Sequence, residues 1–385
     1  MKYFNAIILS FLFLFSTSVS SQQLTDSAKV SILTCDPGRA LYAAFGHTAI
    51  RICDPQLGID LAYNYGMFDF ETEYFYGKFV SGATDYELGI DYTMFFKYRY
   101  EDRKIGVREQ VLNMSLLEKQ HLFEALIINY RPENRKYRYN FVYDNCATRP
   151  RDMIEESLHG DIFYQNDSTS GETFRHSIER YVGKNTWTKF GIDLLIGAES
   201  DQEASARNIM YLPQELEKAL STATRQDGSP VVVESSQMLP SFSIDLSPQQ
   251  PEPLYAMCFV LLFVVICSIF FPRFAQCFDV VLFFVVGIFG SVVFFLTFFS
   301  FHPLVGENYN LLWLNPLYLL MLIFLPFRFK KLNNLFYVAL LITNLVAISG
   351  YLFLPQCFNI AFLPLMVALF IRVILRLKNN FLLFK

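Results

Sequence analysis

Five long apolar runs occupy the last third of the chain and predict a helical membrane domain over residues 254–376. Each run is long enough, or nearly so, to cross a bilayer as a helix. A sixth span or a re-entrant segment is the alternative. The runs cover residues 254–271, 279–298, 311–327, 334–353 and 358–375.

Basic residues between these runs predict the orientation of the helices. Lys and Arg occur in the first linker, in the third linker and at the C-terminus, whereas residues 299–310 and 354–357 contain neither. By the positive-inside rule, the basic positions are cytoplasmic. Residues 377–385 are then a cytoplasmic tail, and the stretch before Leu254 lies outside the cytoplasm.

Residues 1–21 have the pattern of a secretory signal peptide. Lys2 precedes an apolar run from Asn5 to Phe15, which is too short to span the hydrocarbon core. Small residues follow, and we expect cleavage near Ser20 or Ser21; an uncleaved anchor helix is the alternative. Export agrees with the helix orientation, so we expect a multi-pass protein of the bacterial inner membrane with its N-terminal domain in the periplasm.

A mixed pattern of strands and helices predicts a folded periplasmic domain over residues 22–226. Apolar positions at helical spacing predict a helix over Leu116–Tyr130 with Ser115 as its N-cap, and a second helical stretch begins at Cys146. Runs of β-branched and aromatic residues between turns predict strands in the first half, so the fold class is α+β. The expected strands are Val30–Thr34, Thr48–Cys53, Ile59–Tyr65 and Gly106–Leu112.

Residues 227–253 differ in composition from the segments on either side. They are rich in Pro, Ser and Gln, which is typical of a linker between domains. Val231–Val233 have the pattern of a short strand within this stretch.

Composition and charge support two environments for one chain. The chain is 53% hydrophobic, 17% aromatic and only 18% charged, whereas an ordinary soluble domain is about 25% charged. This excludes soluble-only, disordered and nucleic-acid-binding proteins. Before Glu252 the chain has 24 basic and 33 acidic residues, and from there onward it has 8 basic and 3 acidic residues.

Four cysteines face the oxidising side on this topology: Cys35, Cys53, Cys146 and Cys357. A disulfide between Cys35 and Cys53 is the simplest interpretation for an exported domain. Antiparallel pairing of their strands argues against it, because Cys35 then lies opposite the region of His47 and beyond disulfide reach of Cys53. Both alternatives stay open at this point.

Cys146 has the setting of a reactive thiol. It lies at a predicted helix start, with Arg149 and Arg151 in the next turn or two, and both the helix dipole and the arginines would lower its pKa. A thiolate nucleophile needs a base, usually His. His47 is the only periplasmic histidine that opens a predicted strand after a glycine. The alternative is a structural Cys146 with an incidental His47.

Metal and nucleotide motifs are absent from the sequence. It has no C-x-x-C, no H-E-x-x-H and no glycine-rich phosphate loop. We therefore expect no metal site and no cofactor.

The order of a strand-borne His followed by Asn-Cys at a helix start resembles the circularly permuted papain-like proteins, which include NlpC-type hydrolases and the lecithin:retinol acyltransferase group. More closely, nearly the whole chain resembles the Bacteroidota lipoprotein N-acyltransferase family, Lnb. Weaker matches lie at Trp187–Gly197 and in the region of His302 and Asn308–Pro316. The specific stretches are Leu33–Gly38, Gly46–Arg51, Tyr63–Gly66 and Asp144–Asp152.

The resemblance implies a thiol-dependent acyltransferase. Its acyl donor is a phospholipid and its acceptor is the N-terminal amine of a diacylglyceryl-cysteine lipoprotein, with a Cys thioester as intermediate. In this framework Cys146 is the nucleophile, His47 the general base and Asn64 the residue that orients His47, since a hairpin turn near Gln56 brings Tyr63–Tyr65 opposite His47. Asn64 can equally be a surface or turn-capping residue.

Substrate-binding residues are expected in two places. Backbone N–H groups at the helix start near Cys146 would hold the oxyanion, and Arg149 and Arg151 would bind a lipid phosphate. Ion pairs with Asp152 or Glu155 are the alternative for the two arginines. His302 and Asn308, in the external loop 299–310, would guide a substrate; interfacial anchoring explains the aromatic residues that follow without any such role.

Two other functions remain open from the sequence. One is a membrane-tethered cysteine amidase or peptidase of cell-wall peptides, which a single anchor would serve equally well. The other is a non-catalytic periplasmic sensor or scaffold with a structural Cys146. The five-span domain favours the transferase, because phospholipid and lipoprotein both reside in the membrane.

Overall fold

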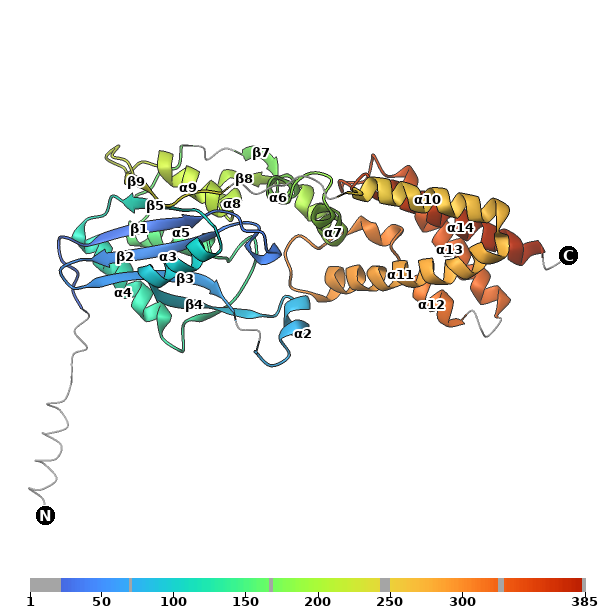
Figure 1. Cartoon of the computed structure of the whole chain (residues 1–385), viewed down its shortest axis with the longest axis horizontal. Helices are drawn as coiled ribbons and strands as arrows, with labels where there is room; N and C mark the ends of the chain where they lie inside the picture. The colour runs from blue at the N-terminus through green and yellow to red at the C-terminus, as the bar shows by residue number, and fades with distance from the viewer. Residues whose placement is uncertain (1–21, 69–70, 166–168, 243–249, 325–328, 383–385) are drawn as a thin grey trace, which may run out of the picture.

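The computed structural model describes residues 22–68, 71–165, 169–242, 250–324 and 329–382, so the expected signal peptide lies outside the described residues. A sheet domain and a bundle of helices lie end to end (Figure 1). The fold class is as expected: a domain of mixed helices and strands is followed by a helical membrane domain.

A seven-stranded antiparallel sheet forms the centre of the N-terminal domain, with the order β6-β4-β3-β2-β1-β5-β9. A second sheet pairs β7 (Thr169–Thr173) with β8 (Glu203–Ser205). The strands of the large sheet are β1 (Lys29–Cys35), β2 (His47–Asp54), β3 (Ile59–Met67), β4 (Asp85–Tyr92), β5 (Val107–Leu112), β6 (Lys136–Arg138) and β9 (Val232–Leu239).

The register of β1 and β2 decides the cysteine question. Cys35 pairs with His47, and Cys53 pairs with Lys29 at the opposite end of the hairpin. Both cysteines are free thiols. The disulfide interpretation is therefore wrong, and the strand geometry that argued against it is confirmed.

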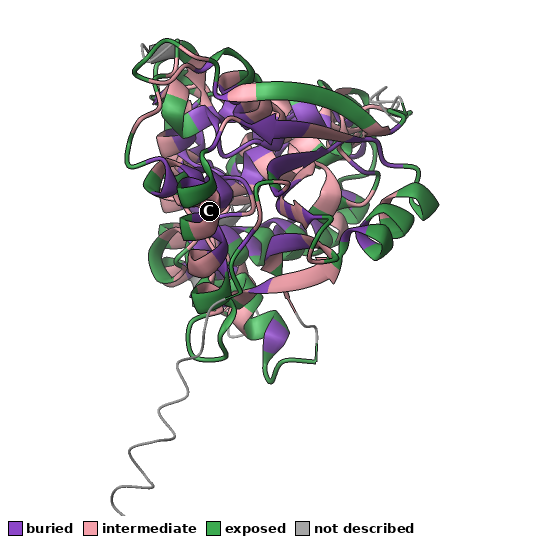
Figure 2. Ribbon diagram, turned by 90° about the vertical axis from the view of Figure 1, so that its left-hand side faces the viewer, coloured by how far each residue is buried: buried purple, intermediate pink, exposed green. Residues whose placement is uncertain are grey.

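The two faces of the sheet are covered by different helices. Side chains of the central strands point alternately to the two faces of the sheet. One face packs under α4 (Leu116–Tyr130), α5 (Thr148–Ser157) and α9 (Pro213–Thr222), and the other packs under α3 (Thr93–Asp102). Burial follows the centre of the sheet, where β1, β2 and β3 are buried along much of their length (Figure 2). As predicted, Ser115 caps α4, with Glu118 completing a capping box.

The expected linker over residues 227–253 is corrected by the structure. Val232–Leu239 form β9, which pairs along β5 at one edge of the large sheet. Backbone hydrogen bonding to β5 outweighs the Pro/Ser/Gln-rich composition, so the folded domain extends to Leu239 rather than ending at Gln226. The remaining helices of the domain are α2 (Phe75–Val80), α6 (Phe174–Val182), α7 (Trp187–Leu195) and α8 (Ala206–Ile209), with single 3₁₀ turns at η1 (Leu41–Ala43) and η2 (Ala198–Asp201).

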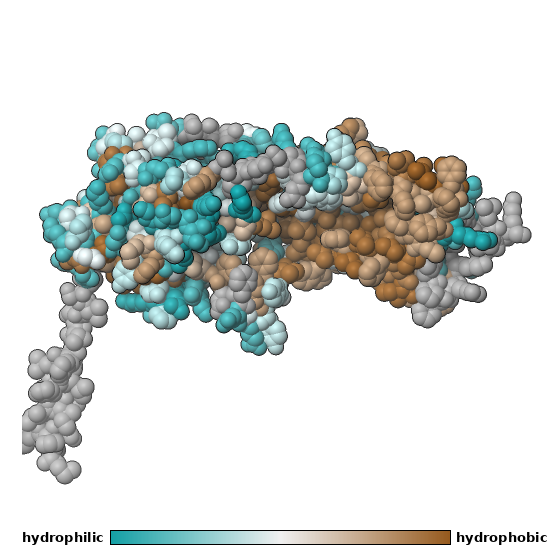
Figure 3. Space-filling model, viewed as in Figure 1, coloured by the Kyte–Doolittle hydropathy of each residue, from teal (hydrophilic) through white to brown (hydrophobic). Residues whose placement is uncertain are grey.

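The helical bundle has the apolar surface of a membrane domain. Within the described residues, three helices are long and apolar enough to cross a bilayer, and apolar side chains cover the outside of the bundle (Figure 3). The other two expected spans are also largely helical. The elements are α10 (Pro253–Phe270), α11 (Pro272–Phe299), η3 (Tyr309–Leu312), α12 (Leu317–Phe324), α13 (Lys330–Ser349) and α14 (Phe362–Leu382).

Charged residues of α14 are neutralised inside the bundle. Arg372 donates to both carboxylate oxygens of Asp279 in α11, at 2.5 and 2.9 Å, and also to the Ser268 hydroxyl of α10 at 2.6 Å. Arg376 joins the same carboxylate. Buried charges within a membrane require such partners, so this cluster ties three helices together.

Helix α7 anchors the sheet domain in the bundle. Leu194 belongs to the buried core of the membrane helices, and the Phe190 ring lies 5.0 Å from that of Phe362 in α14. Asn308 and Asn310, in the loop before α12, donate side-chain hydrogen bonds to backbone carbonyls of α7. The N-terminal domain and the membrane helices are therefore joined by direct packing.

Substituting Gly197 with alanine is expected to open this junction. The Gly197 N–H donates to the Leu304 carbonyl at 2.8 Å, and a Cβ on Gly197 would lie 1.9 Å from the Gly306 carbonyl oxygen. Backbone atoms cannot move aside cheaply, so we expect a loss of roughly 2–4 kcal/mol of stability. Thermal unfolding of the purified protein in detergent measures it.

Gly191→Ala is the matched control, because nothing lies within 4 Å of its added Cβ and alanine favours the helix by up to about 1 kcal/mol. Equal melting temperatures for Gly197→Ala and the wild type would show that the junction does not depend on this close approach.

Candidate functional site

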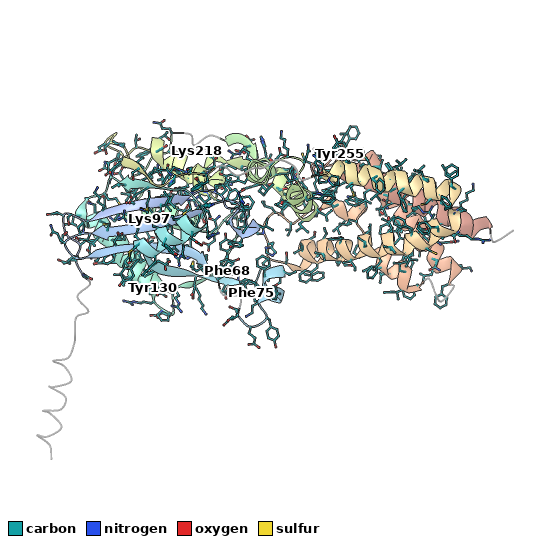
Figure 4. The ribbon with its side chains drawn as sticks, in the orientation of Figure 1. Phe68, Phe75, Lys97, Tyr130, Lys218 and Tyr255 are labelled. Carbon is teal, nitrogen blue, oxygen red and sulfur yellow. The ribbon has the colours of Figure 1, made fainter. Side chains whose placement is uncertain are left out.

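The candidate site lies where the strand ends of the sheet face the membrane helices. Because the strands are antiparallel, this edge brings together the end of β1, the start of β2, the end of β3 and the start of β4. Helix α2, between β3 and β4, is bonded to the loop after α11: Phe301 N–H donates to the Ser81 carbonyl at 2.9 Å. Phe68 and Phe75 stack at this edge, between the sheet and the bundle (Figure 4).

Asn145 holds the turn that carries Cys146. Its Oδ1 accepts from the N–H groups of Ala147 and Thr148, and its Nδ2 donates to the carbonyls of Phe141 and Tyr211. The side chain is 2% exposed, so every polar atom is buried and satisfied. Cys146 directly precedes Ala147, the N-cap of α5, in agreement with the prediction of a helix start.

Cys146 lies against β2 and β3 at this edge. A Cβ on Gly66 would meet the Cβ of Cys146 at 3.6 Å, so the missing side chain of Gly66, which has a φ of +92°, makes room for the cysteine. The backbone N–H of Thr48 hydrogen-bonds to the Cys146 sulfur. Because Thr48 follows His47 in β2, Cys146 lies at the start of the strand that carries His47, and Cys146 is only partly buried.

His47 is held by a chain of side chains on the α3 face of the sheet. Its Nε2 lies 3.2 Å from Asn64 Oδ1, while Asn64 Nδ2 donates to the Ala62 carbonyl and to Asp91 Oδ2, each at 3.2 Å. Arg99 binds the same Asp91 carboxylate. Since the amide nitrogen of Asn64 is used in donating, its oxygen accepts from His47 Nε2–H, which leaves His47 Nδ1 with a free lone pair.

The protonation states differ from the sequence prediction. Burial raises the pKa of the Cys146 thiol to about 11, even though the Thr48 N–H opposes that shift. Burial also lowers the pKa of His47 to about 4, against the effect of its Asn64 hydrogen bond. The predicted lowering of the Cys146 pKa is therefore wrong: desolvation outweighs the backbone N–H groups of Thr48 and Cys146, which favour the thiolate, and in the resting protein the thiol and the His47 imidazole are both neutral.

Alkylation of Cys146 by iodoacetamide is expected to be slow at pH 7.5. Thiolate is the reactive form, and raising the thiol pKa from its ordinary value to about 11 reduces the thiolate fraction by on the order of a hundredfold. The rate should then rise about tenfold per pH unit towards pH 10. Peptide-resolved mass spectrometry measures it, with the urea-unfolded chain as control; equal rates at pH 7.5 for folded and unfolded Cys146 would contradict the neutral thiol.

The two arginines after Cys146 are used inside the domain. Arg149 donates to both carboxylate oxygens of Asp144, at 2.5 and 2.8 Å. Arg151 is 7% exposed, and its donors lie on Asp152 and on the Arg207 carbonyl. Both charges are paired inside the domain, so a lipid phosphate would have to compete with these carboxylates, and the phosphate-binding role of the two arginines stays a prediction. For Arg151 the predicted alternative, an ion pair with Asp152, is what the structure has.

The external loop contacts the sheet domain through α2 and α7. His302 Nε2 lies 2.8 Å from the Phe79 carbonyl of α2. Asn308 is buried, donates to the carbonyls of Leu194 and Leu195 and accepts from Gln356. These contacts join the domain to the bundle, and the expected substrate-guiding role of both residues stays a prediction.

Sequence reasoning missed several groups around the thiol. The hydroxyl of Tyr100, in α3, hydrogen-bonds with the buried Cys35 thiol, and a charge on Cys146 would raise the pKa of both groups. Tyr137 and Tyr139, on and after β6, lie beside Cys146 at Gly66. No periodic pattern marks these tyrosines, because they come from a helix and a three-residue strand far apart in sequence. In the described part of the chain, no three His, Cys, Asp or Glu side chains gather where they could hold a metal ion.

Comparisons with known proteins give two family matches. Residues 18–175 match the family model of the Lnb N-terminal periplasmic domain, and residues 246–380 match that of the Lnb transmembrane domain. The two matches together cover about three quarters of the chain. A search of curated proteins and a search of solved structures find no match.

Proposed function

The chain belongs to the Lnb family of membrane proteins, which resemble lipoprotein N-acyltransferases, and on this premise we propose that it moves an acyl chain from a phospholipid to the N-terminal amine of a diacylated lipoprotein. The observation that carries the proposal is the meeting of Cys146 with the start of β2, where His47 bonds to Asn64. An activatable thiol beside a base is the arrangement that acyl transfer through a thioester requires.

In the first half-reaction, His47 Nδ1 takes the proton of the Cys146 thiol as the sulfur attacks the ester carbonyl carbon. The carbonyl electrons move to oxygen and form a tetrahedral oxyanion. When this intermediate collapses, the bond to the glycerol oxygen breaks, and the His47 imidazolium returns the proton to the leaving lysophospholipid. Cys146 is left as a thioester.

In the second half-reaction, the lipoprotein amine attacks the thioester carbonyl and gives its proton to His47. A second oxyanion forms and collapses, the carbon–sulfur bond breaks, and the Cys146 sulfur leaves and is reprotonated by the imidazolium. The Asn64 oxygen keeps Nε2–H fixed throughout, so that Nδ1 carries the proton in both halves.

The neutral resting pair supports such a sequence. A neutral thiol reacts only slowly with dissolved electrophiles, and His47, with a pKa of about 4, remains an unprotonated base throughout the neutral range. The proton therefore moves only when a carbonyl carbon is within reach of the sulfur.

The location of the site supports a lipid donor. The edge of the sheet that carries Cys146 faces the bundle (Figure 1), and α2 is bonded to the loop after α11. Tyr76 and Phe79 of α2 are exposed beside that loop, which lies at the end of a membrane-spanning helix. Phospholipid esters and diacylated lipoproteins both lie at this depth, and a cell-wall peptide does not. We also propose that the C-terminus is cytoplasmic, which an inactive phosphatase fusion after Lys331 would support and an active one would refute.

Mass spectrometry of a reporter lipoprotein tests the function. The full chain is expressed in bacteria depleted of their own N-acylating enzyme, and the N-terminal peptide of the reporter is analysed. Conversion from diacylated to triacylated termini is the expected result. Unchanged termini at normal expression would refute the transferase, and release of cell-wall peptides by the same cells would point to the hydrolase.

A further inference from the structure

A buried tyrosine hydroxyl at the site has no hydrogen-bond partner among the residues that the structure describes. Tyr137, on β6, is 7% exposed, and its Oη is unpaired there; the Thr48 hydroxyl is also buried and unpaired among these residues. Buried hydroxyls in folded proteins are nearly always bonded, and leaving one unpaired costs about 1–3 kcal/mol. A group kept in this state is available to a ligand or an intermediate that fills the site.

The unpaired hydroxyl lies beside Cys146. A Cβ placed on Gly66 would meet the Cβ of Cys146 at 3.6 Å and the Oη of Tyr137 at 4.0 Å, so both groups lie next to Gly66. The ring is fixed from two directions: Tyr137 pairs with Tyr86 across β4 and β6, and the Arg149 guanidinium lies 3.6 Å from its centroid. Arg149 itself is held by Asp144.

The expected oxyanion donors are already in use. The N–H groups of Ala147 and Thr148 donate to Asn145 Oδ1, and the Arg149 N–H donates to the Asn145 carbonyl at 3.2 Å. Pro150 has no N–H. The amides that follow Cys146 are therefore in use in the resting protein, and of the expected donors only the N–H of Cys146, which is directed at its own sulfur, remains. A second donor would further stabilise a negative charge that develops beside the thiol.

Tyr137 has the properties of that donor. Burial raises the pKa of its hydroxyl far above the ordinary value, so the proton stays in place at neutral pH. The Arg149 cation over the ring withdraws electron density and favours donation. Because the Tyr137 hydroxyl is unpaired in the resting protein, no existing hydrogen bond has to break before it donates to an oxyanion.

We propose that the Tyr137 hydroxyl donates a hydrogen bond to the tetrahedral oxyanion that forms when the Cys146 sulfur adds to an ester or thioester carbonyl. The step rests on the proposed acyl transfer. Carbonyl electrons move to oxygen as the carbon–sulfur bond forms; Tyr137 keeps its proton and gives only the hydrogen bond. When the carbonyl re-forms, the hydroxyl is released unchanged.

The test uses Tyr137→Phe in the full chain, reconstituted with phospholipid and a diacylated lipopeptide. We expect kcat to fall by about 10²–10³-fold, the usual loss for one oxyanion donor, with KM changed less than about threefold. Alkylation of Cys146 by iodoacetamide is the second readout. That displacement at a CH₂ group forms no oxyanion, so its rate at a given pH should stay within about twofold of the wild type, which a disordered site would not allow.

Tyr65→Phe is the matched control. Its ring packs edge-on against Tyr137, 6.1 Å between centroids, and its hydroxyl donates to Asn129 Oδ1 at 3.3 Å. We expect its kcat to lie within about threefold of the wild type. Wild-type kcat in Tyr137→Phe would overturn the oxyanion role, as would an equal loss in acyl transfer and in alkylation. A wild-type protein that transfers no acyl chain would instead refute the proposed function.

Discussion

Replacing Cys146 by alanine abolishes acyl transfer to the reporter lipoprotein, because the substitution removes the atom to which the acyl chain is attached in the proposed mechanism. We expect a loss of at least about 10⁴-fold, as for other covalent nucleophiles. Cys146→Ser is expected to lose nearly as much, since a neutral His47 with a pKa of about 4 is too weak a base to deprotonate an alcohol. The measurement is the triacylated fraction of the reporter at matched expression.

Cys53→Ala is the control for this experiment. Cys53 is a free, partly exposed thiol on the same strand as His47, at its far end opposite Lys29. Its substitution should leave transfer unchanged. If Cys146→Ser kept full activity, the assignment of Cys146 as nucleophile would be wrong whatever the substrate.

Replacing His47 by alanine changes both the rate and its pH dependence. Without a base, attack needs thiolate that is already present, and a Cys146 pKa of about 11 makes thiolate scarce at neutral pH. We expect a loss of about 10²–10⁴-fold at pH 7. The residual rate should then rise about tenfold per pH unit up to pH 9, whereas the wild-type rate should be nearly flat from pH 6 to pH 9, since His47 is already unprotonated there.

Asn64→Ala separates orientation of the base from its chemistry. Asn64 touches His47 Nε2 but no reacting atom, so we expect a loss of roughly tenfold with the flat pH profile retained. A His47→Ala variant with a flat profile, or with wild-type activity at pH 7, would show that another group removes the proton.

The secondary-structure positions of Cys146 and His47, the proposed catalytic pair, could be predicted from sequence because each follows from local pattern. A histidine after Gly46 opens a run of β-branched residues, and Asn-Cys precedes an amphipathic helix, so the elements of both residues are fixed within a few positions. The hairpin also fixes which residues of β1 and β2 pair, and for this reason Cys35 could be expected opposite His47.

The electrostatics of the site could not be predicted in the same way. The charges of Arg149 and Arg151 stand close to Cys146 in sequence, yet they are directed to Asp144 and Asp152. Burial of the thiol depends on β2, β3 and α3 packing around it, which is a tertiary property. Proximity along the chain therefore gave the wrong sign for the pKa of Cys146.

The predicted end of the periplasmic domain at Gln226 was wrong for a related reason. Pro and Ser in residues 227–253 are typical of a linker, but the open edge of β5 provides a partner for Val232–Leu239. Conversely, the sequence pattern predicts that α7 belongs to the periplasmic domain. Only the packing of Leu194 among the membrane helices shows that α7 forms the junction between that domain and the bundle. Edge pairing and packing between distant segments leave no local pattern.

The most direct test of the central claim is the mass of Cys146 itself. The wild-type protein is incubated with a phospholipid of defined acyl chains and no lipoprotein acceptor, and then digested and analysed by mass spectrometry. The mechanism predicts that the Cys146 peptide gains the mass of one acyl group, which neutral hydroxylamine removes and a lipoprotein amine accepts. Transfer to an added lipoprotein with no acyl group ever detectable on Cys146, under conditions that preserve a synthetic thioester, would contradict it.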